Sequence, residues 1–163
     1  MNKKNLTIYL ISGIPASGKS TYARELAATT GALYISRDEI RFSMLKDGED
    51  YFAHEDEVMD SFIEQIQESI NSRHNCIADA THLNYSSRVK VLNRLDLKNA
   101  KVILVIMDTP LAVCMARNAK RDGLARVPDS VIKKMWERHR GPDAEEAKRY
   151  AQIKRIKEAK YDE

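Results

Sequence analysis

The fold is decided by one stretch of sequence, LTIYLIS at residues 6–12 followed by GIPASGKST at residues 13–21. The short apolar, β-branched run at residues 6–11 predicts a buried strand. Residues 13–20 fit the pattern G-x-x-x-x-G-K-[ST], and residues 19–29 follow with helical periodicity. A strand, a loop of this pattern and a helix, in that order, are typical of a phosphate-binding loop.

Each residue type in this loop serves phosphate binding. Gly13 and Gly18 allow the backbone to turn so that successive N–H groups point into one concavity. The helix that follows adds its positive N-terminal end, Lys19 reaches the β- and γ-phosphates, and Ser20 offers a hydroxyl to Mg²⁺. The loop therefore predicts ATP and Mg²⁺ as cofactors, with Ser20 as a metal ligand. The predicted ATP-binding residues are Gly13, Ala16, Ser17, Gly18, Lys19, Ser20 and Thr21.

Apolar segments and helical patterns alternate along the rest of the chain. Further strands are predicted at residues 32–36, 76–78 and 102–107, and helices from Ser36, over residues 54–73 and over residues 85–97. Residues 150–156 fit either a fifth strand or a helix, and their spacing favours a helix. Strands separated by helices indicate βαβ crossovers and a parallel sheet. The predicted fold class is α/β: a P-loop NTPase with a parallel sheet of four or five strands, flanked by helices on both faces, with a helical lid.

Composition and charge limit what kind of protein this is. The chain has 163 residues, 43% of them hydrophobic and 31% charged, which predicts a single globular domain over residues 1–163. No apolar run approaches the roughly 20 residues of a membrane span, and the run after the N-terminus is too short for a signal peptide. We therefore expect a cytoplasmic protein with no membrane partner. Cys76 and Cys114 lie far apart and are expected to be buried free thiols.

The remaining motifs distinguish among P-loop proteins. A switch GTPase needs a guanine-reading N-K-x-D motif, and residues 118–122 have the letters but not the spacing. A remodelling ATPase needs a longer chain, whereas a small kinase fits the size. We therefore expect a kinase, which moves the γ-phosphate of ATP onto an acceptor hydroxyl.

Asp38 and Arg41 are the candidate residues on the acceptor side. They follow the second predicted strand and are three residues apart, hence on one face of a helix. Ligands of open α/β sheets bind beyond the carboxyl ends of the strands, where these residues lie. An acidic group there can accept the proton of the acceptor hydroxyl, and Arg41 can hold the acceptor's phosphate. The first turn of a helix also favours Asp, so the spacing alone leaves a structural role for Asp38 equally open.

A second group of polar residues follows the third strand at residues 79–84, DATHLN, with Arg88 four residues beyond Asn84. Asp79 ends its strand close to where a Walker-B acid would act through Mg²⁺ or its water. Asp108 ends the fourth strand and competes for that role. The predicted substrate-binding residues are Arg41, Asp79, Thr81, Asn84 and Arg88.

Arg117 and Arg121 are four residues apart and project from one side of a predicted helix. With the loop DGLAR at residues 122–126 and the following VP, this helix forms a candidate lid at residues 114–128. Lid arginines stabilise the charge on a transferring phosphoryl group. The alternative is a basic surface helix without a catalytic role. The predicted catalytic residues are Lys19, Asp38, Arg117 and Arg121.

Together these motifs resemble the kinase domain of polynucleotide 5′-hydroxyl kinases of the phage and eukaryotic repair type, P-loop kinases of the AAA-like ATP-binding family. GxPASGKST, RDEIR, DATHLN and RNxKR…VP occur in that family's order and at its approximate spacings, within residues 6–142. The resemblance implies that Lys19 and Ser20 bind ATP and Mg²⁺ and that Asp38 is the general base. It also implies that Arg41 contacts the phosphate next to the acceptor end, and that the two lid arginines contact the donor phosphates.

The acceptor that the resemblance implies is the 5′-hydroxyl end of DNA or RNA, which makes nucleic acid the expected partner. His82 departs from the family, which more often has Asn there, and no D-x-D-G-T-like phosphatase motif occurs. The basic C-terminal segment at residues 143–163 has no counterpart and fits either a nucleic-acid contact or the interface of a homo-oligomer. Two alternative functions stay open: a P-loop kinase for a small-molecule hydroxyl (nucleoside, sugar or antibiotic), and a non-catalytic ATP-binding protein.

Overall fold

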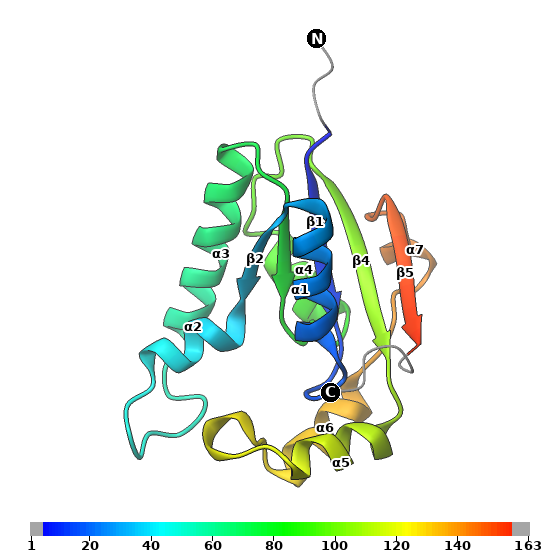
Figure 1. Cartoon of the computed structure of the whole chain (residues 1–163). Helices are drawn as coiled ribbons and strands as arrows, with labels where there is room; N and C mark the ends of the chain where they lie inside the picture. The colour runs from blue at the N-terminus through cyan, green and yellow to red at the C-terminus, as the bar shows by residue number, and fades with distance from the viewer. Residues whose placement is uncertain (1–4, 158–163) are drawn as a thin grey trace.

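The computed structural model of the protein describes residues 5–157 and shows one five-stranded sheet flanked by helices (Figure 1). Expectations for residues 1–4 and 158–163 lie outside the described residues. The strands are β1 (Thr7–Ser12), β2 (Leu33–Ser36), β3 (Cys76–Asp79), β4 (Lys101–Asp108) and β5 (Gln152–Lys157). The helices are α1 (Lys19–Thr30), α2 (Arg37–Met44), α3 (Glu55–Asn71), α4 (Tyr85–Leu92), α5 (Leu111–Ala119), α6 (Asp129–Arg138) and α7 (Ala144–Ala147), with a 3₁₀ turn, η1, at Gly123–Ala125.

All five strands are parallel, in the order β2-β3-β1-β4-β5. Strand β1 lies in the middle, where Leu10 pairs with Ala78 of β3 and Leu104 of β4, and all three residues are fully buried. Apolar runs such as VILVIM at residues 102–107 suit central parallel strands, because helices cover both faces of the sheet. The predicted fold class is confirmed: the chain has the α/β P-loop NTPase fold.

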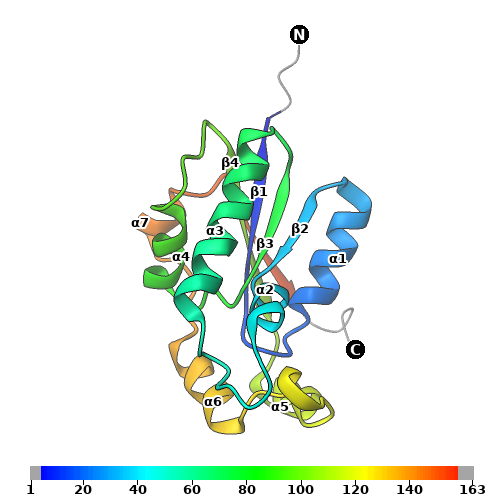
Figure 2. The same ribbon diagram turned by 90° about the vertical axis from the view of Figure 1, so that its left-hand side faces the viewer.

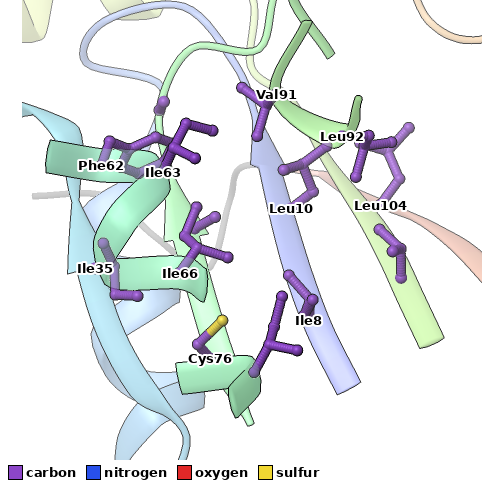
Figure 3. Close-up of a cluster of buried hydrophobic side chains, with 14 of the residues drawn as sticks. Ile8, Leu10, Ile35, Phe62, Ile63, Ile66, Cys76, Val91, Leu92 and Leu104 are labelled. Carbon is purple, nitrogen blue, oxygen red and sulfur yellow. The ribbon is translucent and has the colours of Figure 1, made fainter. Parts of the chain in front are cut away.

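Two apolar clusters cover the two faces of the sheet. In Figure 2, α3 and α4 lie on one side of the strands and α1 lies on the other. On the α3 side, Phe62 and Ile66 share one cluster with Ile8 and Leu10 of β1, as Figure 3 shows. The buried residues of α3 recur every three or four positions, so one face of this helix meets the sheet. On the α1 side, Tyr22 belongs to the second cluster.

Residues 150–156, for which the sequence leaves a fifth strand and a helix open, lie mostly in strand β5, so the strand alternative is confirmed and the helix that their spacing favours is wrong. In β5, Ile153 pairs with Leu104 and Ile156 pairs with Met107 of β4. Ile153 packs against the cluster on the α3 side and Ile156 against the cluster on the α1 side. A separation of three residues suits one face of a helix, but in a strand it places the side chains on opposite faces. Both faces of the sheet offer an apolar partner here, and the strand is stable for that reason.

The described part of the basic C-terminal segment, residues 143–157, is built into the fold as α7 and β5. β5 forms an edge of the sheet. Charged side chains on an edge strand, here Lys154, Arg155 and Lys157, discourage pairing with another strand. Positive charge in this segment therefore has a structural reason, and its contact with nucleic acid or a second copy stays a prediction.

Three smaller features also bear on the sequence expectations. Helix α4 ends at Leu92 rather than at residue 97, and the positive φ angles of Lys98 (48°) and Asn99 (65°) turn the chain toward β4. Cys76 and Cys114 are buried free thiols, as expected. Within residues 5–157, no helix is long and apolar enough to cross a membrane.

The carboxyl ends of the strands face the lower edge of the molecule in Figure 1. Helices α2, α5 and α6 and the loop at residues 45–54 gather at this edge in both views. Ligands of open α/β sheets bind beyond this end of the strands. The fold therefore brings the phosphate-binding loop, the residues that follow β2 and β3, and the candidate lid to one place.

Candidate active site

The phosphate-binding loop between β1 and α1 is held from both neighbouring strands. Gly13 N donates to Thr81 O at 2.9 Å, beyond β3, and Thr109 Oγ1, beyond β4, donates to Ser17 O at 2.7 Å. A Cβ atom on Gly13 would lie 2.6 Å from Ser17 Oγ, so a side chain has no room there. Gly18 precedes α1 with a φ of 93°, a left-handed conformation that favours glycine. The two glycines of the motif are thus required by the geometry of the loop.

Lys19 is the first residue of α1 and folds back over the loop. Its Nζ donates to Ile14 O at 2.9 Å. Burial lowers the pKa of Lys19, whereas the carboxylates of Asp79 and Asp38 act to raise it. Phosphate oxygens next to the ammonium group would favour its charged form in the same way. Lys19 is therefore placed to neutralise phosphates that the loop N–H groups bind.

Asp79, at the end of β3, contacts Ser20 at the start of α1. Ser20 Oγ donates to Asp79 Oδ2 at 3.1 Å, and Tyr34 OH donates to the same oxygen at 2.5 Å. Burial raises the pKa of Asp79, and these two hydrogen bonds oppose the rise. The competing candidate, Asp108, lies with Oδ1 3.5 Å from Arg155 Nη1. Asp79 is therefore the acid that contacts the predicted magnesium ligand.

The Ser20 hydroxyl and the Asp79 carboxylate fit the oxygen ligands that Mg²⁺ prefers. Residues 5–157 contain no group of three or more His, Cys, Asp or Glu side chains that could hold a metal ion. Mg²⁺ commonly binds through one or two protein oxygens together with water and substrate phosphates. The two oxygens present suit a magnesium ion that arrives with a nucleotide.

Asp38 lies in the first turn of α2. Ser36 caps this helix, because its Oγ accepts a hydrogen bond from Glu39 N at 3.1 Å. The Glu39 carboxylate itself pairs with Arg24 of α1. The Asp38 side chain is 59% exposed, and its Oδ1 accepts hydrogen bonds from Arg41 Nη1 and, at 2.8 Å, from Tyr51 OH. These bonds orient a carboxylate that remains accessible, as a general base must be.

Arg41 connects Asp38 to α3 and is itself only 5% exposed. Its Nε and Nη2 donate to Glu55 Oε1 at 2.9 and 2.5 Å, and its Nη1 donates to Tyr51 OH at 2.9 Å. The guanidinium carbon lies 4.5 Å from the centre of the Tyr51 ring. Arg37 reaches the same carboxylate, with Nη2 3.1 Å from Glu55 Oε2. Two arginines and two carboxylates thus form one ion-pair network.

Sequence reasoning missed four residues of this network and its surroundings: Arg37, Tyr51, Phe52 and Glu55. Tyr51 and Phe52 belong to the irregular loop between α2 and α3, where no spacing rule predicts the direction of a side chain. Their rings meet edge to face, with centroids 4.7 Å apart, and Phe52 is 43% exposed. The one signal in the sequence was a pair of adjacent aromatic residues in the loop that follows Asp38.

The candidate lid comprises most of α5 together with η1. Arg121 lines the cleft, whereas Arg117 is buried and its Nη1 donates to Ala16 O of the phosphate-binding loop at 3.2 Å. The Asn118 side chain holds the far end of the segment: its Nδ2 donates to Val127 O at 2.7 Å, and its Oδ1 accepts from Val127 N at 3.0 Å. The two arginines, expected on one side of the helix, therefore occupy different environments.

One cleft brings most of these groups together. The predicted residues that line it are Ala16, Gly18, Lys19, Ser20, Asp38, Arg41, Asp79, Thr81 and Arg121. The predicted residues outside its lining are Gly13, Ser17, Thr21, Asn84, Arg88 and Arg117. Its ionisable lining comprises four cationic side chains and three carboxylates, an excess of one positive charge: Lys19, Arg37, Arg41, Arg121, Asp38, Glu55 and Asp79. This excess suits an anionic ligand.

Arg88, a predicted substrate ligand, is instead part of the scaffold. Its side chain is fully buried, and its Nε and Nη2 donate to the Glu146 carboxylate of α7 at 2.6 and 2.8 Å. Its Nη1 donates to His82 O at 3.0 Å, and Tyr150 OH donates to Glu146 at 2.6 Å. The helix face that carries Arg88 packs against the C-terminal segment, which the spacing to Asn84 does not indicate. Asn84 itself caps α4.

His82, the departure from the resembled family, is a structural residue. It is buried, has a φ of 38°, and its Nδ1 lies 2.6 Å from Ile11 O of β1. Its carbonyl accepts a hydrogen bond from Ser12 Oγ at 2.8 Å. Burial lowers the pKa of His82 to about 4, so the imidazole is neutral at neutral pH. It holds the segment after β3 against β1.

Residues 8–142 match the model of a protein family described as an AAA domain. The chain belongs to this AAA domain family. The matched residues contain the phosphate-binding loop, Asp38 and both arginines of the candidate lid. Every residue that lines the cleft lies among them. No curated protein matches the chain in sequence.

Solved structures similar to this AAA domain come from proteins of different kinds. A sugar kinase from Janibacter sp. HTCC2649 has a TM-score of 0.66 at 18% identity, over 94% of this chain and 85% of that one. A chain of the Pnkp1/Rnl/Hen1 RNA repair complex has a TM-score of 0.71 at 23% identity, over 84% of this chain and 45% of that one. Kti12 from Chaetomium thermophilum, in complex with ADP-AlF3, has a TM-score of 0.69 at 16% identity, over 92% and 88%. These similarities show the shared fold.

Proposed function

We propose that the protein is an ATP-dependent kinase that transfers the γ-phosphate of ATP to the 5′-hydroxyl end of DNA or RNA. One observation supports this most strongly: the carboxylate of Asp38 lines the same cleft as Lys19, Ser20 and Arg121. A protein that only binds ATP needs the phosphate-binding loop, but needs neither an accessible carboxylate beside it nor an arginine from a lid.

On the donor side, residues 13–21 bind the phosphates of ATP through loop N–H groups and Lys19. Arg121 adds a positive charge to the cleft, and Arg117 supports the loop through Ala16 O. When bound at Ser20 and Asp79, directly or through water, Mg²⁺ supplies further neutralisation of the phosphate charge.

On the acceptor side, Asp38 accepts a hydrogen bond from the acceptor hydroxyl and takes its proton as the oxygen attacks the γ-phosphorus. The bond between that phosphorus and the β,γ-bridging oxygen breaks, and ADP leaves with the electron pair. Lys19 and Arg121 stabilise the charge that spreads over the transferring group. The deprotonated Asp38 is regenerated when the proton passes to solvent.

Two features of the acceptor side support a polynucleotide end. Phe52 lines the cleft and is 43% exposed, and nucleobases stack on such aromatic side chains. The four motifs that resemble polynucleotide kinases include the segment that carries Asp38 and Arg41. A sugar or another small-molecule hydroxyl is the second candidate, supported by the similarity to a sugar kinase.

The test is transfer of label from γ-labelled ATP, with Mg²⁺, to a short 5′-hydroxyl oligonucleotide and, separately, to a panel of sugars and nucleosides. We expect labelled oligonucleotide, and Asp38→Asn should lower the rate by at least about 100-fold while ATP still binds. Asp56→Asn is the matched control, because Asp56 is an exposed acid in the first turn of α3 outside the cleft lining. It should retain wild-type activity.

Three results would contradict the proposal in different ways. Full transfer by Asp38→Asn would remove Asp38 as the base. Label on a sugar or nucleoside, but not on the oligonucleotide, would establish the second candidate. ATP binding without transfer to any acceptor would point to a non-catalytic protein.

A further inference from the structure

The hydroxyl of Tyr51 already makes the contact that the proposed mechanism requires of an acceptor. Tyr51 lies in the loop between α2 and α3, and its OH donates to Asp38 Oδ1 at 2.8 Å. A general base has to lie about 2.6–3.2 Å from the hydroxyl oxygen whose proton it takes. Arg41 orients Asp38 by donating to the same oxygen. A hydroxyl, a base within hydrogen-bond reach and a third group that orients the base are the signature of an activated nucleophile.

Tyr51 also lies in the cleft that contains the donor groups. Lys19 and Ser20 of the phosphate-binding loop line this cleft together with Asp38 and Tyr51. Other hydroxyl groups of the lining have other tasks: Ser20 contacts the acid at the predicted magnesium site, and Ser36 caps α2. Tyr51 is the hydroxyl that contacts the candidate base.

The surroundings of Tyr51 suit both the acceptor and its product. Burial, followed by the charge of Asp38, raises the pKa of Tyr51, so the phenol keeps its proton at neutral pH and needs a base to become a nucleophile. Arg41 Nη1 donates to Tyr51 OH at 2.9 Å, and its guanidinium carbon lies 4.5 Å from the centre of the ring. An arginine in this position can pair with a phosphate group on the same oxygen.

We propose that Tyr51 is a site of self-phosphorylation, to which the protein transfers the γ-phosphate of ATP when no other acceptor is bound. This inference rests on the kinase chemistry of the proposed function and adds a second acceptor that belongs to the protein itself. The Tyr51 oxygen forms a bond to the γ-phosphorus as Asp38 takes the phenol proton. The bond between that phosphorus and the β,γ-bridging oxygen breaks, and ADP leaves with the electron pair. Because all these groups line one cleft, the transfer occurs within one molecule.

A phosphate on Tyr51 changes the acceptor side of the cleft. It adds about 1.5 to 2 negative charges at neutral pH. The carboxylates of Asp38 and Glu55 line the same cleft, so the added charge repels an anionic acceptor. The phosphate also occupies the space beside Asp38 that the acceptor hydroxyl needs. We therefore expect self-phosphorylation to inhibit transfer to any other acceptor.

The experiment incubates the protein with ATP and Mg²⁺ and without an acceptor, and then measures the intact mass and maps phosphopeptides by mass spectrometry. The variants are Tyr51→Phe, which keeps the ring, Asp38→Asn and, as a matched control, Tyr85→Phe. Tyr85 is an exposed tyrosine of α4 outside the cleft lining. Lys19→Ala, mixed with the wild type, reports on transfer between molecules.

We expect the wild type and Tyr85→Phe to gain one phosphate, which maps to Tyr51 in both. Tyr51→Phe and Asp38→Asn should gain almost none, and Lys19→Ala should stay unmodified in the mixture.

A second measurement does not depend on catalysis. Binding of a 5′-hydroxyl oligonucleotide without ATP, followed by fluorescence anisotropy, should be about 10-fold weaker for the phosphorylated wild type than for the unmodified protein. Treatment with a tyrosine phosphatase should restore the affinity. Equal affinities of the two forms would contradict the inhibitory role.

The inference is overturned if the wild type gains no phosphate on Tyr51, if Tyr51→Phe is modified to the same extent, or if the wild type modifies Lys19→Ala. The proposed function fails separately. Label on an oligonucleotide with Tyr51 unmodified would refute the inference and keep the function. A phosphate on Tyr51 without transfer to any oligonucleotide would keep the inference and remove the polynucleotide acceptor.

Discussion

The proposed kinase has a donor half and an acceptor half in its cleft, and the two are built in different ways. The donor half is one continuous stretch, residues 13–21, and its shape depends on backbone contacts such as Gly13 N to Thr81 O. The acceptor half joins α2, the loop at residues 45–54 and α3, and it is held by contacts between side chains, above all the network around Arg41. The first half is local in sequence, and the second is assembled from three segments.

The contrast separates the general part of the chemistry from the part that is specific to one acceptor. A backbone loop at the start of a helix binds phosphates in the same way for any reaction that uses a nucleoside triphosphate. A side-chain network can change with a few substitutions while the sheet stays the same. Proteins with this fold can therefore share a donor and differ in their acceptor, and the acceptor has to be inferred from the network itself.

The largest expected effect tests whether Arg88 belongs to either half. Because its buried partner Glu146 would be left without a counter-charge, Arg88→Met should lower the free energy of unfolding by about 3–5 kcal/mol. Arg94→Met is the control, since Arg94 forms an exposed pair with Asp60, and it should cost about 1 kcal/mol or less. Urea unfolding measures both. A variant of wild-type stability with a raised KM for the acceptor would return Arg88 to the substrate site.

The next-largest effect tests whether the donor half contributes equally to transfer onto every acceptor. Lys19→Ala should lower transfer about 1000-fold, equivalent to about 4 kcal/mol, and by the same factor for oligonucleotide and small-molecule acceptors. Lys90→Ala, an exposed lysine on α4, serves as the control and should leave the rate unchanged. Rates of label transfer from ATP give the comparison. A loss that depends strongly on the acceptor would mean that Lys19 also contacts the acceptor.

A third prediction concerns the pH dependence of the free energy of unfolding, and it involves His82 in the segment after β3. The pKa of His82 is about 4 in the folded protein and ordinarily 6.5, so the unfolded chain binds more protons between these values. Stability is therefore full above pH 6.5 and falls as the pH approaches 4, with about 2 kcal/mol lost to His82 between pH 7 and pH 5. His82→Asn should lose correspondingly less over that range, because Asn tolerates the positive φ and does not titrate.

Urea midpoints of the wild type and His82→Asn at both pH values measure this difference. Other titrating groups contribute to both proteins and cancel in the comparison. An equal drop in stability in the two proteins would show that His82 does not titrate as its burial requires.

The smallest expected effect tests how the acceptor half holds its base. Tyr51→Phe removes one hydrogen bond to Asp38 and keeps the ring. It should lower kcat about 2- to 10-fold and leave the KM for ATP unchanged. Tyr85→Phe, at an exposed tyrosine of α4, is the matched control. Steady-state kinetics distinguish the outcomes. A raised KM for ATP in Tyr51→Phe would show that the acceptor half also contributes to ATP binding.

The sheet and the donor half could be predicted because their signals are local. An apolar run followed by the glycine motif predicts a strand and a phosphate-binding loop, and the periodic apolar residues of α3 predict a helix packed on the sheet. Strand β5 could not be distinguished from a helix, since the separation of Ile153 and Ile156 fits one helix face as well as two faces of a strand.

The acceptor half and the scaffold residues depend on contacts between distant parts of the chain. Arg41 meets Glu55, 14 residues later, only because the loop between α2 and α3 folds back. Arg88 meets Glu146, 58 residues later, and no periodicity in α4 contains that information. Asp38 could be proposed from its place after a strand, but its hydrogen bonds with Arg41 and Tyr51 required the structure.

We propose that one cleft joins an ATP phosphate site to an acceptor site for a 5′-hydroxyl polynucleotide end. The most direct test of this proposal is to incubate the protein with γ-labelled ATP, Mg²⁺, a 5′-hydroxyl oligonucleotide and the sugar panel in one mixture, and then digest the oligonucleotide to mononucleotides. We expect label in the 5′-phosphate of the terminal nucleotide with the wild type, and almost none with Asp38→Asn. Label on a sugar and none on the oligonucleotide would contradict it.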